Sequence, residues 1–161
     1  MFVDCTDCSF TNVHTRSYMA QQEIIYLTPA EAKRLEAIKK RYRDSARARF
    51  EERVAYYHPV TGGHYNSITV RDQKSRWGSC SSRGTLSFNY RLIFAPPAVL
   101  DYVVVHELCH LTFMNHSKDF WNKVAAVMPD YRIHKKWLKD HGHELSAEAH
   151  MKKLGIPIKL E

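Results

Sequence analysis

The stretch His106-Glu107-Leu108-Cys109-His110 combines residue types and a spacing that suit a metal centre. On an α-helix, residues four positions apart share one face and lie about 6 Å apart along the axis. Two imidazoles placed in this way can bind one tetrahedral zinc ion together. Glu107, between them, is positioned to take a proton from a water molecule that the ion activates. The stretch therefore predicts metal-assisted hydrolysis, with His106 and His110 as ligands and Glu107 as general base.

A catalytic zinc usually has three protein ligands and leaves a fourth position for water. His116 is the first candidate for the third ligand, because a helix that stops near Met114-Asn115 lets the chain return to the metal. Asn115 suits such a stop, and Ser117 then suits the N-cap of a following helix. A glutamate on a later helix is the alternative, with Glu144 and Glu148 as candidates.

The residues before the motif argue that it did not arise by chance. Ala98 to Val105 is strongly apolar, so a helix over this run would be buried. Histidine and glutamate on the buried side of such a helix need a compensating partner, since an uncompensated buried charge is costly. A bound metal ion supplies that partner, and we expect one zinc ion.

A second electrophile should stabilise the negative charge that develops on the attacked oxygen. The candidates for this role or for other substrate contacts are Arg76, Asn89, Tyr131 and His134. Ligating histidines also usually donate their outer ring N–H to a carboxylate or carbonyl. Asp101 and Asp119 are candidates for that contact, although Asp101, five residues before His106, shares its helical face poorly.

A long helix is predicted upstream of the motif. Thr28-Pro29 supplies an N-cap and a proline at the first position, and Glu31 completes a capping box. An apolar stripe recurs at intervals of three or four residues, at Leu35, Ile38, Tyr42, Ala46, Phe50 and Val54. The helix should run to about Tyr56 and end at His58-Pro59 and Gly62-Gly63.

Two strands and a loop should then lead to the motif. Tyr65 to Arg71 and Gly84 to Leu92 alternate apolar and polar residues, as strands do, and Gln73 to Arg83 reads as a loop. The second strand, within Thr85 to Tyr90, is predicted to form the rim of a cleft, where an exposed edge could hold an extended peptide. Pro97 should open the active-site helix, which would end near Phe113.

The C-terminal part reads as helical. The predicted helices are Ser117 to Met128, Asp130 to His141 with Ile133 and Trp137 facing inwards, and a short one over Ser146 to Leu154. A helix, two or three strands, the active-site helix and a helical end make an α+β architecture with a small antiparallel or mixed sheet. We divide the chain into an N-terminal extension, 1–25, and one domain, 26–161.

Composition indicates an ordinary globular domain with an excess of positive charge. The chain has 161 residues, 44% of them hydrophobic, and a formal net charge of +7. No apolar run is long enough to cross a membrane, and the start of the chain lacks the pattern of a signal peptide, so we expect a cytoplasmic protein without membrane contact. Cys5 and Cys8 form a single C-x-x-C pair, for which free thiols are the simpler interpretation. Lys and Arg outnumber Asp and Glu from Thr28 to Arg53, which allows nucleic acid as a partner.

Four separated motifs resemble one known family. They are Gln73 to Ser81, Leu86 to Leu92, Pro97 to Leu111 and Asn115 to Trp121, and they are similar to the YgjP-like metallopeptidases. That family has the zincin fold and is related to the SprT-like, WLM and minigluzincin proteins. The resemblance runs from about Arg43 to Trp137. It implies a zincin-like domain with zinc at His106, His110 and His116, and with Glu107 as general base.

Three functions compete at this point. A zinc peptidase acting on polypeptide agrees with the motif, the ligand spacing and the rim strand. A zinc phosphohydrolase acting on nucleotides would use a basic cluster around the motif, formed by Arg71, Lys74, Arg76, Arg83 and Arg91. A nucleic-acid-associated protease, by analogy with SprT-like relatives, would dock through the basic first helix. The sequence leaves the substrate and the oligomeric state open.

Overall fold

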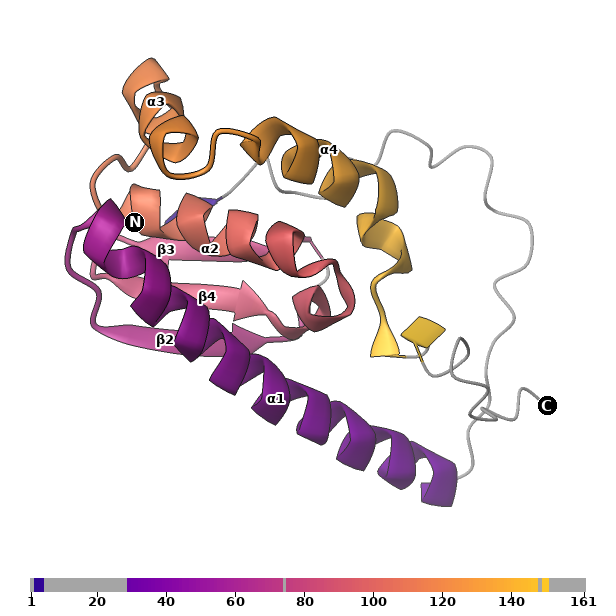
Figure 1. The fold of residues 1–161 in the computed structure, drawn as a ribbon. Helices are drawn as coiled ribbons and strands as arrows, with labels where there is room; N and C mark the ends of the chain where they lie inside the picture. Colours follow the sequence, from indigo (N-terminus) through magenta and orange to yellow (C-terminus); the bar gives the residue numbers. More distant parts are fainter. Residues whose placement is uncertain (1, 5–28, 74, 148, 151–161) are drawn as a thin grey trace.

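We analysed a computed structural model, which describes residues 2–4, 29–73, 75–147 and 149–150 (Figure 1). The helices are α1 (Pro29–Thr61), α2 (Pro97–His110), α3 (Lys118–Val127) and α4 (Tyr131–His141). The strands are β1 (Phe2–Asp4), β2 (Ser67–Arg71), β3 (Gly78–Ser81) and β4 (Thr85–Asn89). Two short 3-10 helices, η2 (Tyr90–Phe94) and η3 (Gly142–Glu144), follow β4 and α4.

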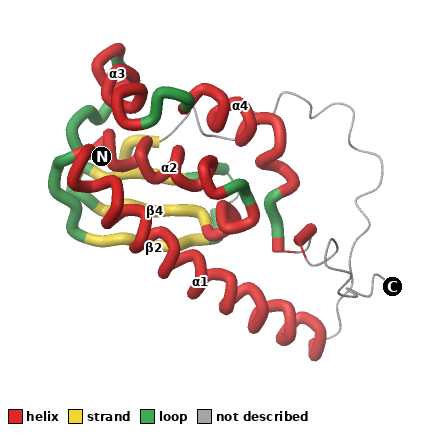
Figure 2. Tube along the Cα trace, in the orientation of Figure 1, coloured by secondary structure: helices red, strands yellow, loops and turns green. Residues whose placement is uncertain are grey.

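The strands form one small mixed sheet in the order β1-β3-β4-β2. β2 and β4 are parallel, whereas β3 is antiparallel to both β4 and β1. Figure 2 shows α1 and α2 crossing in front of this sheet, with α3 and α4 above α2, on the side away from α1. The α+β prediction with a small mixed sheet and a helical C-terminal part is confirmed.

The predicted loop over Gln73 to Arg83 is wrong in its second half, because β3 lies there. Gly-Ser-Cys-Ser has neither β-branched nor aromatic residues, so it carries no local strand signal. All four residues are buried, and pairing with β4 holds them extended. Gly84, at φ 74°, makes the turn between the two strands, and its N–H donates to the Ser81 carbonyl.

The position of β3 also corrects the predicted rim of the cleft. β4 lies between β3 and β2, so its backbone edges are already paired. An extended peptide therefore cannot add to β4. β1 comes from the predicted N-terminal extension and pairs with β3, while residues 5–28 lie outside the described ranges. The domain boundary near residue 25 stays a prediction.

α1 is longer than its sequence indicates. It continues through Pro59 to Thr61, so the predicted end at His58-Pro59 is wrong. Proline lacks the N–H that would bond to the carbonyl four residues earlier, so α1 loses one backbone hydrogen bond at Pro59 and ends two residues later. Gly62, at φ 65°, ends the helix, and its N–H donates to the carbonyl of His58.

The core lies between the sheet and the two central helices. The predicted stripe of α1 is confirmed at Ala46, Phe50 and Val54, which are fully buried. Phe50 stacks on Phe88 of β4, with ring centroids 4.5 Å apart. On α2, every residue from Val99 to His110 is buried, as expected for an apolar helix covered on all sides.

The C-terminal prediction holds in part. α3 and α4 begin and end within one residue of the predicted bounds. Ile133 was expected to face inwards but is 66% exposed, while Trp137 is partly buried against the core. Residues 147, 149 and 150 are helical, and the rest of the predicted last helix lies outside the described ranges. None of the helices in the described part combines the length and apolar character that a bilayer crossing requires.

Candidate metal centre

α2 carries the motif into the middle of the protein. Pro97 occupies its first turn, where the missing N–H of proline has no intrahelical acceptor to lose. His106, Glu107 and His110 have no exposed surface. Their burial agrees with the prediction that these polar groups face a site in the interior.

α2 ends at His110, several residues before the predicted end near Phe113. After His110 the chain makes a tight turn, in which the N–H groups of Thr112 and Phe113 both donate to the Cys109 carbonyl. The Phe113 carbonyl in turn accepts a hydrogen bond from Nδ1 of His110 at 2.9 Å. The early end of the helix therefore also orients a histidine of the motif.

His116 lies between this turn and α3. Ser117 is the N-cap of α3, as predicted, and its hydroxyl accepts a hydrogen bond from the N–H of Phe120. Asn115 accepts a hydrogen bond from the N–H of Ser117 through its side chain, which shapes the preceding turn. These local contacts fix the backbone on both sides of His116 and direct it towards α2.

The three histidines converge on one point. The Nε2 atom of His110 lies 3.2 Å from that of His106 and 3.2 Å from that of His116, and the remaining pair is 3.0 Å apart. Three zinc ligands at a tetrahedral ion, each about 2.0 Å from it, would be about 3.3 Å apart. Glu144, the alternative ligand, is not in this group, and Glu148 lies outside the described residues.

The chemistry of the donors fits a metal ion. His110 donates through Nδ1, so its Nε2 carries a lone pair directed at the other two rings. Burial holds the pKa of His106 well below its ordinary value and lowers the pKa of His110 to about 4, so both rings are neutral. Three ring nitrogens that face one point cannot all be satisfied by one another, whereas a cation at that point satisfies all three.

Glu107 lies against the backbone of β3. A Cβ atom added at Gly78 would lie 2.5 Å from Oε1 of Glu107 and 2.8 Å from its Cγ. Only glycine therefore leaves room for the carboxylate at this point. Gly78 lies in the motif Gln73 to Ser81, but nothing in the residues Trp77-Gly78-Ser79 links it to Glu107 before the fold is known.

Aromatic rings surround the histidines. Phe120 stacks on His110 with a centroid distance of 4.4 Å, and Trp121 stacks on His116 at 5.6 Å. Tyr131 stacks on Trp121 at 5.3 Å. The first turn of α3 therefore supplies two rings that hold the ligands in place, and α4 supports one of them from behind.

The other predicted contact residues lie in different surroundings. Tyr131 is one of the aromatic residues around the histidines, and its hydroxyl accepts a hydrogen bond from Nε of Arg132. His134 contacts Asp130 at 3.1 Å, and Arg76 lies partly buried in the loop before β3. Asn89 is fully buried, which argues against the predicted contact with substrate.

Asn89 instead fastens the loop between β2 and β3. Its amide group donates to the carbonyls of Gln73 and Arg76, and its side-chain oxygen accepts from the N–H of Arg91. Trp77, in the same loop, is buried against Gly142 after α4, where a Cβ atom would lie 2.7 Å from its ring. Both residues thus position the start of β3 and hence Gly78.

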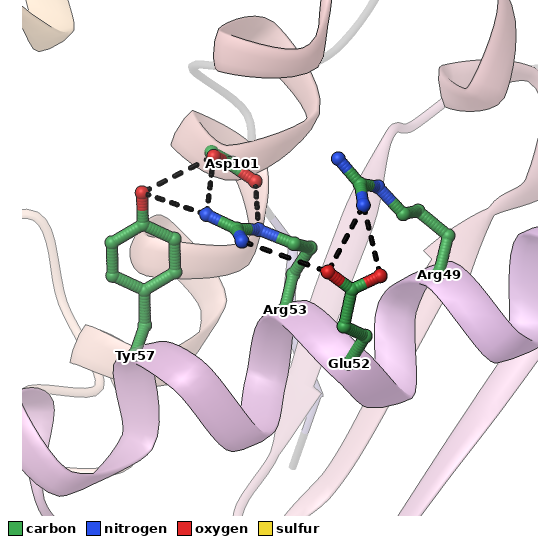
Figure 3. Close-up of polar contacts among 5 residues, drawn as sticks. All are labelled: Arg49, Glu52, Arg53, Tyr57 and Asp101. Atoms are coloured by element: carbon green, nitrogen blue, oxygen red, sulfur yellow. Dashed lines mark hydrogen bonds and ion pairs between the residues drawn. The ribbon is translucent and has the colours of Figure 1, made fainter.

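A second polar cluster holds α2 to α1 (Figure 3). The guanidinium of Arg53 contacts Asp101 twice, with distances of 2.7 and 2.8 Å, and the hydroxyl of Tyr57 donates to the same carboxylate at 3.2 Å. Asp101 was a candidate for orienting a ligand histidine. That role is corrected, because its carboxylate is engaged by α1.

The basic residues noted around the motif and on α1 either lie apart in the structure or are paired with acidic residues in several cases. Arg91 is paired with Asp72, and Arg83 lies at the turn after β3, whereas Arg76 lies before this strand. Lys74 lies outside the described residues. Much of the charge on α1 is also paired within the helix, as in Lys40–Asp44 and Arg49–Glu52.

Comparison with known proteins places the chain in a family. Residues 10–141 match the family described as "YgjP-like, metallopeptidase domain". Among solved structures, the crystal structure of the metallopeptidase zymogen of Pyrococcus abyssi abylysin is similar, with 24% sequence identity and a TM-score of 0.49. The alignment covers 66% of this chain and 95% of that chain. None of the curated proteins compared with the sequence matches it. Because the family match spans most of the chain, beyond the four motifs at both ends, the protein belongs to the YgjP-like metallopeptidases.

Proposed function

We propose that this metallopeptidase is zinc-dependent, with His106, His110 and His116 as the ligands of one ion and Glu107 as the general base. The observation that carries the proposal is the convergence of three Nε2 atoms within 3.2 Å of one another, next to a buried glutamate. Bound zinc would supply a Lewis acid that makes a water molecule nucleophilic near neutral pH and polarises the scissile carbonyl. An all-imidazole donor set suits zinc well.

The protein residues provide proton transfer and orientation. Glu107 accepts the proton of the attacking water and passes it to the leaving nitrogen. Gly78 supports this role, because the absence of a side chain lets the carboxylate lie against β3. Phe120 stacks on His110 and limits its rotation, so the imidazole keeps its direction without a carboxylate partner.

Tyr131 is our proposal for the group that stabilises the developing negative charge. Tyr131 stacks on Trp121, which is itself stacked on the ligand histidine His116. His134 instead contacts Asp130. A Tyr131→Phe variant should lower kcat while keeping the metal content, and an unchanged kcat would exclude the hydroxyl.

The deciding experiment compares zinc-loaded protein with its Glu107→Gln and Glu144→Gln variants. Each is incubated with unfolded casein and, separately, with nucleoside triphosphates. Casein cleavage that is lost only in Glu107→Gln supports the proposal, because Glu144 lies on η3 outside the histidine group. Release of phosphate that depends on Glu107, with casein intact, would replace the peptidase by a phosphohydrolase.

Nucleic-acid docking through α1 stays a prediction. Several of its cations contact acidic residues of the same helix, which favours a solvated surface. Binding to duplex or single-stranded DNA at low salt that weakens steeply as salt rises would support docking. The absence of such binding would remove the nucleic-acid-associated protease as an alternative.

A further inference from the structure

The three histidines of the candidate metal centre differ in their exposure within the described part of the chain. His106 and His110 have no exposed surface, whereas His116 is partly exposed. A substrate must therefore approach the three Nε2 atoms from the side of His116. The residues next to this histidine form the surroundings that the substrate meets, and they can select among substrates.

Trp121 is the ring that covers His116. The two rings are close to parallel, with an interplanar angle of 24°, and Trp121 is itself only partly buried. The ammonium group of Lys135 lies over Trp121, 4.3 Å from the ring centroid. A cation held over an aromatic face is attracted by the negative charge of the π system. The fold thus places a positive charge beside the entrance to the metal centre.

The position of Lys135 follows from α4. Lys135 is one turn after Tyr131, so the two residues share the face of α4 that meets Trp121. No sequence motif marks Lys135. Its spacing from Tyr131 predicts a position near Trp121 only once α4 is known to pack against that ring.

Asp130, just before α4, and Asp140, near its end, both contact side chains of this helix. Asp130 contacts His134 at 3.1 Å, and Asp140 forms an ion pair with Lys136. Arg132 adds a further positive charge three residues before Lys135, with its guanidinium over the Tyr131 ring. The charge that this part of α4 brings to Trp121 and Tyr131 is therefore positive, and it complements an anion.

We propose that Lys135 determines specificity by binding a carboxylate of the peptide substrate close to the scissile bond. This inference rests on the proposed peptidase function. An ammonium group donates charge-assisted hydrogen bonds to a carboxylate, and a partly buried one is less screened by salt than a fully exposed one. The carboxylate belongs to an acidic side chain or to the C-terminus of the peptide.

The test uses matched peptides that differ only in charge. One pair has Glu or Gln next to the cleaved bond, and another pair ends in a free carboxylate or an amide. We expect wild-type kcat/KM to favour the carboxylate of one pair by roughly tenfold to a hundredfold. Lys135→Gln should remove this preference through KM, and Lys136→Gln should keep it, because Lys136 pairs with Asp140. The pair that shows the effect identifies the source of the carboxylate.

Three results would overturn the proposal. Wild-type enzyme that cleaves both members of each pair equally well has no carboxylate site. A preference that survives in Lys135→Gln belongs to another residue. An equal loss of kcat for charged and neutral peptides in Lys135→Gln would mean that the lysine acts on every substrate, through the reacting oxygen or through the packing of Trp121.

A binding measurement separates this inference from the proposed function. Dye-labelled forms of the same peptides are titrated against zinc-loaded Glu107→Gln protein and followed by fluorescence anisotropy. Tighter binding of the carboxylate peptide that is lost in Glu107→Gln/Lys135→Gln supports the site, even if no peptide is cleaved by the wild type. Equal binding of charged and neutral peptides overturns it, even if casein is cleaved.

Discussion

α2 carries two buried polar clusters, which differ in whether other protein groups balance their charges and hydrogen-bonding atoms. Asp101, in its first half, meets the guanidinium of Arg53 and the hydroxyl of Tyr57 (Figure 3). His106 and His110, in its second half, meet His116. The first cluster joins an anion to a cation and a hydrogen-bond donor, so its charges are balanced by the protein. The second joins three imidazole rings, two of which burial keeps neutral, and a cation between them would accept the lone pairs of all three Nε2 atoms.

One helix therefore carries a cluster that stabilises the fold and a second that is the candidate metal site. The Arg53–Asp101 contact stabilises the packing of α1 on α2, and the proximity of Asp101 raises the pKa of the Arg53 guanidinium above its ordinary value. The histidine cluster contributes stability only when it binds a ligand from outside. Changes in the first cluster should therefore alter unfolding, and changes in the second should alter metal binding and catalysis.

Replacing His116 by Ala should produce the largest effect. Loss of a direct ligand should weaken zinc binding by more than the roughly 100-fold that loss of an outer hydrogen-bond partner costs. Competition with a chelator of known affinity measures this change. Full zinc retention would show that another residue completes the site.

Gly78→Ala should reduce activity by about 100-fold, the loss associated with a misplacement of about 1 Å. The added methyl group would lie 2.5 Å from Oε1 of Glu107 and must displace the carboxylate. Zinc content should stay close to that of the wild type, because no ligand is touched. Casein hydrolysis and metal analysis on the same preparation check both points, and unchanged kcat would argue against Glu107 as general base.

Asp101→Asn should lower the free energy of unfolding by about 2–3 kcal/mol, because the largely buried Arg53 loses its closest carboxylate and keeps the more distant one of Glu52, 3.9 Å away. Urea denaturation of the metal-free protein measures the loss. Asp44→Asn, which removes an exposed pair with Lys40, is the matched control and should cost less than about 1 kcal/mol. Zinc affinity should not change in either variant, and a large fall in Asp101→Asn would mean that the two clusters are coupled.

The pH dependence should give the smallest effect. The pKa of His110 is lowered to about 4 from an ordinary value of 6.5 because the ring is buried, so the unfolded chain binds protons more readily between these values. The metal-free protein should therefore lose stability as pH falls from 6.5 towards 4. Thermal unfolding at several pH values checks the slope, which should decrease in His110→Gln. A slope that is unchanged in this variant would assign the effect to other groups.

Local patterns predicted the elements that depend on neighbours in sequence. The i, i+4 spacing of His106 and His110 and the N-cap at Ser117 needed only helical geometry. The stripe through Ala46, Phe50 and Val54 was also correct, because periodic apolar residues indicate the buried face of a helix. The helix ends were less accurate, since the contacts of Gly62 and Phe113 that end α1 and α2 are not encoded in periodicity.

Contacts between distant residues escaped sequence analysis. β3 was missed because four small residues become a strand only when β4 pairs with them. Asn89 was expected at the substrate, yet its side chain is used by backbone groups of the loop from Gln73 to Arg76. Asp101 was considered as a hydrogen-bond partner of His106 on the same helix. Its observed partner, Arg53, lies 48 positions earlier in the sequence.

The sequence by itself determined the candidate ligands and base: two histidines and a glutamate on one helix, a third histidine after a turn, and an apolar helix to bury them. These features follow from short-range geometry, which the chain carries in its spacing. Only the tertiary structure decided that Gly78 leaves room for Glu107 and that Lys135 lies over Trp121 beside His116. The physical reason is that such contacts join separate elements, and their geometry exists only after α2, β3 and α4 have packed together.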